Sequence, residues 1–313
     1  MLALINDAFF DLAFFLQLLT NGLSNGAIYA AMALTVVIIY KTTGHLNFAQ
    51  GELATFTAFL IYVISVEKDI NIWIAIPIVL VVAMAMGGAV ERFLVRPVES
   101  RSGLAVVIVT LGLFLLLNAL TAVIWGTLPK AALTPFPGGI DDQFILMEGP
   151  PRFAIGYDAI GTWVVLAAVV LGVSLLMNKT KLGLGYRAVA SNRESAELVG
   201  VPVSRMLMLG WALSTAIGAL GGVLVSQSAG TLDFNLMGSA LIYGFAAAAL
   251  GGFDSVKGAV VGGLIVGLAE ALLPNLFTFI GAELSLAMAL VIILGVLLAR
   301  PQGLFGSRKV LRV

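Results

Sequence analysis

Few residues of this chain are of types that do chemistry. It has one histidine, His45, and no cysteine, which excludes thiolate nucleophiles, disulfides and metal sites built from several histidines. Residues 183–188, Gly-Leu-Gly-Tyr-Arg-Ala, match a dinucleotide-binding pattern, but they follow an apolar stretch rather than a β-strand. We interpret this segment as a flexible loop entry and His45 as a structural loop residue. We expect no catalytic residue, no metal site and no bound cofactor on this chain.

Four polar residues stand out because apolar sequence surrounds them: Asn25, Glu52, Asn118 and Glu270. Polar groups within a membrane-spanning helix are costly, so they mark either helix contacts or a substrate path. Both interpretations fit each of the four residues. No series of Asp, Glu and His follows any apolar stretch, which argues against a proton-coupled transporter.

The chain that positions these groups is unusually apolar. Of its 313 residues, 60% are hydrophobic and 11% are charged, and the mean hydropathy is +1.06. A soluble domain has about a quarter of its residues charged, so soluble enzymes, disordered scaffolds and nucleic-acid binders are excluded. Glycines four residues apart indicate closely packed helices; they occur at Gly22/Gly26, Gly218/Gly222, Gly258/Gly262 and Gly263/Gly267. The expected fold is all-α, a polytopic membrane helix bundle forming one domain over residues 1–313.

Apolar stretches give the expected spans. A hydrocarbon core of about 30 Å needs roughly 20 apolar residues per helix. We expect about 8–10 transmembrane helices, with nine at 22–40, 48–66, 72–90, 103–125, 159–177, 206–226, 239–252, 258–273 and 284–299. The spans 239–252 and 258–273 are short and contain glycine, so we expect broken helices there. The stretch 8–20 is either an interfacial helix or part of a tilted, broken span with 22–40.

Basic residues predict the orientation. With the N-terminus outside and nine spans, cytoplasmic segments hold 14 of the 17 Lys and Arg residues, which places the C-terminus in the cytoplasm. The external loop 126–158 is rich in Pro and Gly and should be irregular and largely without helix. The cytoplasmic loop 178–205 should contain a short helix at 191–200, capped by Ser191 or Asn192 and ended by Gly200. Such a helix is positioned to contact a soluble partner.

Five segments carry a more specific pattern. The first two are Asn-Gly-Leu and Gly-Ala-Ile-Tyr-Ala within 21–30, and Asn-Phe-Ala-Gln-Gly-Glu at 47–52. The third is Arg-Ala-Val-Ala, Ala196 and Leu-Val-Gly-Val within 187–201. The last two are Leu-Gly-Gly-Phe-Asp-Ser-Val-Lys-Gly-Ala, Gly-Gly and Gly-Leu-Ala-Glu within 250–270, and Arg-Pro-Gln-Gly-Leu-Phe-Gly at 300–306. In order and spacing they resemble the smaller permease subunit of ATP-binding-cassette importers for branched-chain amino acids. The resemblance covers almost the whole chain. Gln50 departs from the pattern, because many members have His there.

The resemblance implies an assembly in a bacterial plasma membrane. A second, related permease would form the translocation path with this chain, and an external solute-binding protein would deliver substrate. Two cytoplasmic subunits would bind ATP and Mg²⁺ and hydrolyse the ATP, while this chain would bind no cofactor and have no enzymatic activity.

Two sets of site residues are predicted. The resemblance makes the helix at 191–200 the element that couples the permease to the ATPase, and residues around an apolar ridge of Ala196, Leu198 and Val199 would make the contact. The coupling set is Arg187, Asn192, Arg193, Glu194, Ala196, Leu198, Val199 and Gly200. The predicted translocation path passes the broken spans and includes Asn47, Gln50, Glu52, Asn118, Gly251, Gly258 and Glu270.

Other functions stay open on the sequence. Members of the same family also transport urea, short amides and other small organic solutes by the same mechanism. From another class, a self-sufficient secondary transporter or channel would transport substrate without partner subunits. A membrane-embedded enzyme has no catalytic set to support it.

Overall fold

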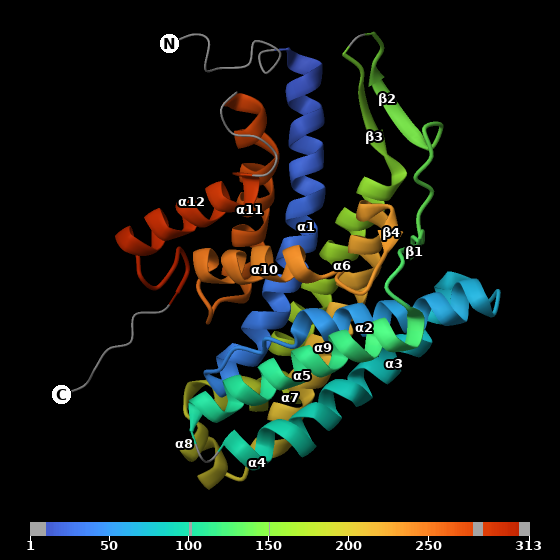
Figure 1. Cartoon of the computed structure of the whole chain (residues 1–313). Helices are drawn as coiled ribbons and strands as arrows, with labels where there is room; N and C mark the ends of the chain where they lie inside the picture. Colours follow the sequence, from blue (N-terminus) through green and yellow to red (C-terminus); the bar gives the residue numbers. More distant parts are fainter. Residues whose placement is uncertain (1–10, 100–101, 150, 278–283, 307–313) are drawn as a thin grey trace. The chain divides into compact units, whose positions relative to one another are not determined.

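A computed structural model of the chain describes residues 11–99, 102–149, 151–277 and 284–306 (Figure 1). Most of these residues are helical. The helices are α1 (Leu12–Thr43), α2 (Gln50–Tyr62), α3 (Ile72–Ala89), α4 (Arg96–Glu99), α5 (Gly103–Trp125), α6 (Tyr157–Lys179), α7 (Lys181–Ser191), α8 (Arg193–Leu198), α9 (Val203–Ala229), α10 (Gly238–Gly251), α11 (Val256–Leu276) and α12 (Ser285–Ala299). Two π-helical turns, η3 (Val63–Glu67) and η4 (Val90–Val95), extend α2 and α3.

The helices confirm the predicted fold class, a polytopic helical membrane protein. A helix lies at each of the nine predicted spans. Within the described part of the chain, six helical stretches are long and apolar enough to cross a membrane, namely α1, 72–99, α5, α6, α9 and α11. The helix at 239–252 is short as predicted, because α10 has 14 residues and would rise only about 21 Å.

Two predictions about broken spans are wrong. The second half of the stretch 8–20 joins the next span in one unbroken helix, α1, of 32 residues; residues 8–10 lie outside the described residues. A helix of this length rises about 48 Å, so it is tilted or extends beyond the hydrocarbon layer. The span at 258–273 is also continuous within α11, where Ser255 caps the first turn by accepting a hydrogen bond from the amide of Gly258 at 3.0 Å. The glycines of α1 and α11 allow close packing and do not interrupt either helix.

The chain divides into two compact units. The first unit comprises residues Met1–Ala33, Phe136–Ala167 and Ile242–Val313, and the second comprises Leu34–Pro135 and Ala168–Leu241. Helices α1, α6 and α10 each contribute residues to both units.

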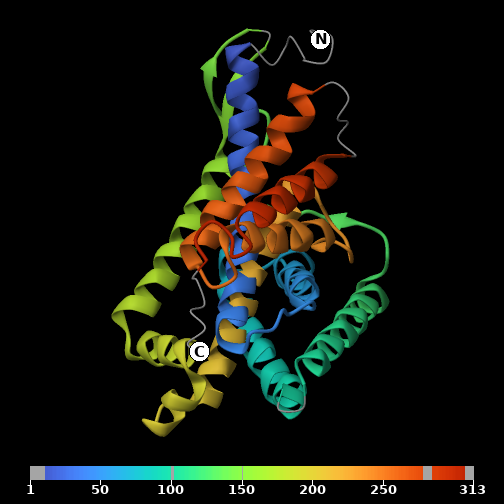
Figure 2. The same ribbon diagram turned by 90° about the vertical axis from the view of Figure 1, so that its left-hand side faces the viewer.

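In the first unit, α11 runs alongside the first half of α1 (Figures 1 and 2). Glycines form the contact between the two helices, as the four-residue spacing predicted. A Cβ atom on Gly26 would lie 2.9 Å from the Cα atom of Leu264, and one on Gly22 would lie 3.0 Å from that of Leu268. Gly263 and Gly267 likewise face backbone atoms of Ala30 and Gly26. Without side chains in the way, the two backbones approach closely and gain dispersion contacts along the glycine seam, which we define as Gly22, Gly26, Gly263 and Gly267.

In the second unit, α9 packs against α2 and α3. Gly222 allows the approach to α2, since its Cβ would lie 2.7 Å from the carbonyl oxygen of Ala54. Trp211 of α9 is fully buried in an apolar cluster with Ile39, Val95 and Val106.

The Pro- and Gly-rich segment 126–158 contains short strands, which the sequence did not predict. Strands β2 (Gln143–Met147) and β3 (Phe153–Gly156) form an antiparallel hairpin, and β1 (Lys130–Ala131) pairs with β4 (Thr231–Leu232). The prediction that this loop lacks helix is confirmed for its described residues up to Gly156, after which α6 begins.

Candidate functional site

The predicted coupling helix is present, but it is shorter than expected and a second helix precedes it. Helix α7 ends at Ser191, and α8 covers Arg193–Leu198. Asn192 is the cap: its Oδ1 accepts a hydrogen bond from the backbone amide of Ser195 at 2.8 Å. Gly200 follows with φ +83°, a left-handed conformation that favours glycine and ends the helix.

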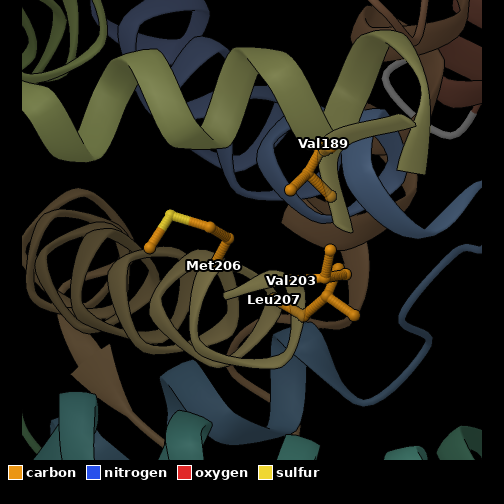
Figure 3. Packing of buried hydrophobic residues seen from close by; sticks show 5 residues of the cluster. Val189, Val203, Met206 and Leu207 are labelled. Atoms are coloured by element: carbon orange, nitrogen blue, oxygen red, sulfur yellow. The ribbon is translucent and has the colours of Figure 1, made fainter. Parts of the chain in front are cut away.

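The predicted apolar ridge of α8 is only partly correct. Ala196 is 3% exposed and packs in a buried cluster with Val189, Val203, Met206 and Leu207. Figure 3 shows Val189 of α7 opposite Val203, Leu207 and Met206 of α9. Ala196 therefore faces inward and anchors α8 to α7 and α9.

Leu198 and Val199 point away from this cluster, at 88% and 78% exposed. Arg187, Asn192 and Glu194 are exposed as well. A charge at position 196 would disrupt the fold itself, so substitutions at Leu198 and Val199 are the better test of docking.

Arg193, a member of the predicted coupling set, pairs within the chain. Its guanidinium donates two hydrogen bonds to Glu99 at the end of α4, with nitrogen–oxygen distances of 2.7 and 3.0 Å. The hydrogen bonds with Glu99 raise the pKa of Arg193 above its ordinary value. The bidentate pair fixes the start of α8 against α4.

A second arginine strengthens the same junction. Arg96 pairs with Glu91 at 2.6 Å and donates to the backbone carbonyl of Ser204 at 3.0 Å. The sequence reasoning missed Glu91 and Glu99. The charged residues at 91–99 are close enough in sequence to indicate the pairing of Arg96 with Glu91. They do not reveal the distant partners Ser204 and Arg193.

The motif 183–188 lies within α7, so its interpretation as a flexible loop entry is wrong. Gly183 faces the backbone of Leu176 and Met177 at the end of α6, where a Cβ atom would collide. Tyr186 is buried and donates to the carbonyl of Ile38, and its burial raises the pKa of its hydroxyl above the ordinary value. The glycine of this motif therefore serves helix packing.

The predicted path residues of the second unit form two polar groups. In the first, Asn47 donates to Gln50 Oε1 at 3.1 Å, and Gln50 Nε2 donates to the carbonyl of Ser214 at 3.1 Å. Ser214 Oγ lies 3.1 Å from Gln50 Oε1 and 2.9 Å from the carbonyl of Thr35. Asn47 and Gln50 are buried, and their hydrogen bonds join the start of α2 to α1 and α9.

The second polar group brings Glu52 and Asn118 together. Asn118 Nδ2 lies 3.4 Å from Glu52 Oε2, 3.3 Å from the carbonyl of Phe234 and 3.1 Å from Asn235 Oδ1. Glu52 is 3% exposed. Asn118 thus ties α2 and α5 to the turn that precedes α10.

The predicted path residues of the first unit are of two kinds. Gly251 and Gly258 face one another, and a Cβ atom on either would collide with the carbonyl of the other. Replacing Gly258 by Leu would therefore break the α10–α11 contact before it obstructed a path.

Glu270 of α11 instead makes side-chain contacts. Its Oε2 accepts hydrogen bonds from Tyr29 Oη at 2.7 Å and from Asn25 Nδ2 at 3.2 Å. The ring of Tyr29 stacks on that of Tyr243, with centroids 4.5 Å apart and planes 23° from parallel. The sequence singled out Asn25 and Glu270 but missed both tyrosines, because nothing in an apolar helix distinguishes a hydrogen-bonded tyrosine.

Among the described residues, no three His, Cys, Asp or Glu side chains gather in a way that could hold a metal ion. The four acidic or amide groups that the sequence singled out pair with one another or with neighbouring tyrosine and asparagine side chains within their own units.

Comparisons with known proteins agree with the resemblance. The family model described as branched-chain amino acid transport system / permease component matches residues 18–299. The high-affinity branched-chain amino acid transport system permease protein LivH of Escherichia coli is 28% identical over 96% of this chain and 98% of its own. BraD of Pseudomonas aeruginosa, with the same description, is 29% identical over the same shares. The probable LivH permease of Methanocaldococcus jannaschii is 27% identical over 88% of this chain and 87% of its own.

Proposed function

Since the chain belongs to the family of permease components of branched-chain amino acid transport systems, we propose that it is a membrane subunit of an ATP-driven importer for leucine, isoleucine and valine. The similarity to LivH and BraD permeases over 96% of the chain supports this substrate class. All of residues 1–313 act as one permease domain, which binds no cofactor.

The single observation that carries the coupling part of the proposal is the exposed tip of α8. Leu198 and Val199 are almost fully exposed on a helix that the chain itself holds in place through Ala196 and Arg193. Apolar side chains on a rigid support can enter a groove of a soluble subunit at little cost in conformational entropy. We assign this groove to a cytoplasmic ATPase subunit, which binds ATP and Mg²⁺. Arg187, Asn192 and Glu194 lie at the rim of the contact.

The remaining partners follow from the same proposal. A second permease subunit completes the membrane part, two ATPase subunits drive it, and an external solute-binding protein delivers the amino acid. In this assembly, the chain is a multi-pass protein of a bacterial plasma membrane.

Contacts within the second unit support the proposed assignment of segments to the same side of the membrane. Arg193–Glu99 and Arg96–Ser204 join two segments that the basic residues assign to the cytoplasm. The pairing of β1 with β4 joins two segments assigned to the outside. Segments assigned to one side therefore contact segments assigned to the same side, as the proposed order of spans requires.

For the translocation path, the proposal favours residues that keep some exposed surface. Glu270 and Asn118 are partly exposed, whereas Asn47, Gln50 and Glu52 are buried in hydrogen-bonded groups. The buried residues, with Gly251 and Gly258, hold the helices that border the path.

Paired substitutions on α8 test the proposal. Leu198→Glu with Val199→Glu places two charges in the contact without touching the buried cluster, and Leu184→Glu on α7, at a position 62% exposed, is the control. We expect the double variant to insert normally, to lose co-purification with the ATPase subunits, and to lose leucine uptake at least about tenfold. Normal uptake by the double variant, or leucine transport by the isolated chain in ATP-free liposomes, would refute the coupling role.

A further inference from the structure

Glu270 lies within a membrane-spanning helix without a cationic partner. It belongs to α11, one of the six stretches long and apolar enough to cross a membrane. Its hydrogen-bond partners among the described residues, Tyr29 and Asn25, are neutral. Lys257, the basic residue of the same helix, is 13 positions away, or about 20 Å along the axis. A carboxylate in such surroundings is costly unless a positive charge compensates it.

One oxygen of the Glu270 carboxylate accepts two hydrogen bonds, and the other accepts none from the described residues. Both donors, Tyr29 Oη and Asn25 Nδ2, bind Oε2. No donor from the described residues reaches Oε1 within hydrogen-bonding distance. The residue as a whole is also partly exposed.

The surrounding helices hold the carboxylate in a fixed position. Tyr29 is itself fixed by stacking on Tyr243 of α10, and the glycine seam locks α1 against α11 next to Glu270. A charged group held by packing and by two hydrogen bonds does not need to reorganise when a ligand arrives.

The location along the helix suits the entry of a substrate. Glu270 is six residues before the end of α11 at Leu276, which corresponds to about 9 Å along the axis. In the proposed orientation this is the external end of the helix. A solute released outside the membrane would therefore enter from the end of α11 at which Glu270 lies.

We propose that Glu270, through its Oε1, binds the α-ammonium group of an amino acid during import, with Tyr29 and Asn25 as positioning residues. This inference rests on the proposed function, because it takes the substrate to be a zwitterionic amino acid. An ammonium group supplies the missing positive charge together with N–H donors, and charge-assisted hydrogen bonds to carboxylates are among the stronger ones. Urea and short amides carry no such charge, so this site selects against them.

The test uses the whole importer, with its second permease, ATPase subunits and binding protein, reconstituted in liposomes and supplied with L-leucine. Glu270→Gln keeps the size of the side chain and an oxygen acceptor for Tyr29, but it removes the charge. We expect leucine uptake to fall at least about tenfold in this variant. Glu270→Asp keeps the charge and should lose less than Glu270→Gln. Glu67→Gln, which neutralises an exposed carboxylate elsewhere, is the control and should leave uptake unchanged.

Thermal unfolding of each purified variant shows whether a loss of uptake reflects a loss of fold. Leucine uptake by Glu270→Gln at the wild-type rate would overturn the inference while leaving the proposed function intact. Equal losses in Glu270→Asp and Glu270→Gln, both folded, would also overturn it, because shape rather than charge would then matter. If the wild-type importer takes up no leucine at all, the proposed function is wrong and the inference falls with it.

Discussion

Each of the two compact units contains one of the glutamates that the sequence singled out within an apolar stretch, and the surroundings of Glu52 and Glu270 differ. Glu52, in the second unit, is 3% exposed and lies beside Asn118, whose amide also contacts Phe234 and Asn235. Glu270, in the first unit, is partly exposed and accepts two hydrogen bonds on one oxygen only. The same residue type thus serves in one place to join helices and in the other is open to a ligand.

The glycine seam of the first unit and the polar groups of the second unit hold helices together in different ways. In the first unit, glycines let α1 and α11 approach until their backbones touch. In the second unit, the amide and hydroxyl groups of Gln50, Ser214 and Asn118 make hydrogen bonds that hold its helices together. A glycine contact tolerates no added atom, whereas a polar contact fails only when its donor or acceptor is removed. Substitutions at these two kinds of contact should therefore differ in severity.

The largest effect is expected at the glycine seam. In Gly267→Leu, the new side chain would collide with the backbone of Gly26 and lie close to the carbonyl oxygen of Gly22. Backbone atoms cannot move aside, so we expect the purified permease to lose about 3 kcal/mol or more of stability. Thermal unfolding in detergent measures this loss. Gly112→Leu on α5, with nothing within 4 Å of the added Cβ, is the control, and equal stability of the two variants would contradict the seam.

A smaller effect is expected at the polar contact of the second unit. Asn118→Ala removes the amide that connects Glu52 with Phe234 and Asn235. Hydrogen bonds between membrane helices contribute modestly, so we expect a loss of about 1–2 kcal/mol of stability. Asn178→Ala, which removes an exposed amide that contacts Ser174, should change the unfolding temperature little. If Asn118→Ala loses as much stability as Gly267→Leu, polar contacts and glycine contacts are equally sensitive to substitution.

The smallest effect is expected for Glu52→Gln, which compares Glu52 directly with Glu270. Glu52→Gln keeps an oxygen that can accept from Asn118, and Glu52 is buried from any ligand. We expect leucine uptake by the reconstituted importer to change by about threefold or less, which corresponds to less than about 0.7 kcal/mol. Glu270→Gln, measured in parallel, should lose far more. A similar loss in both variants would place Glu52 on the translocation path and remove the distinction between the units.

The positions of the helices could be predicted from the sequence because the bilayer imposes one requirement on every span. Each span needs a run of apolar residues, and the runs are visible without knowing their neighbours. The cap at Asn192 and the stop at Gly200 were also predictable, since both depend on the backbone within a few residues. The continuity of α1 and α11 was not, because the sequence does not say whether a glycine bends a helix or packs against another one.

The candidate sites show the same limit more sharply. The residue types Glu52, Asn118, Asn25 and Glu270 were recognisable because polar groups are rare in this composition. Their partners were not, since Glu270 and Tyr29 are 241 residues apart and Arg193 and Glu99 are 94 apart. Likewise, the helical period alone could not say that Ala196 faces inward while Leu198 and Val199 face outward. The sequence by itself determined a helical membrane protein and a short capped helix that ends before Gly200, because those depend on composition and local hydrogen bonds. Only the tertiary structure decided which polar groups have all their hydrogen-bond partners and which keep an acceptor without a donor. The reason is that these partners lie far apart in the chain.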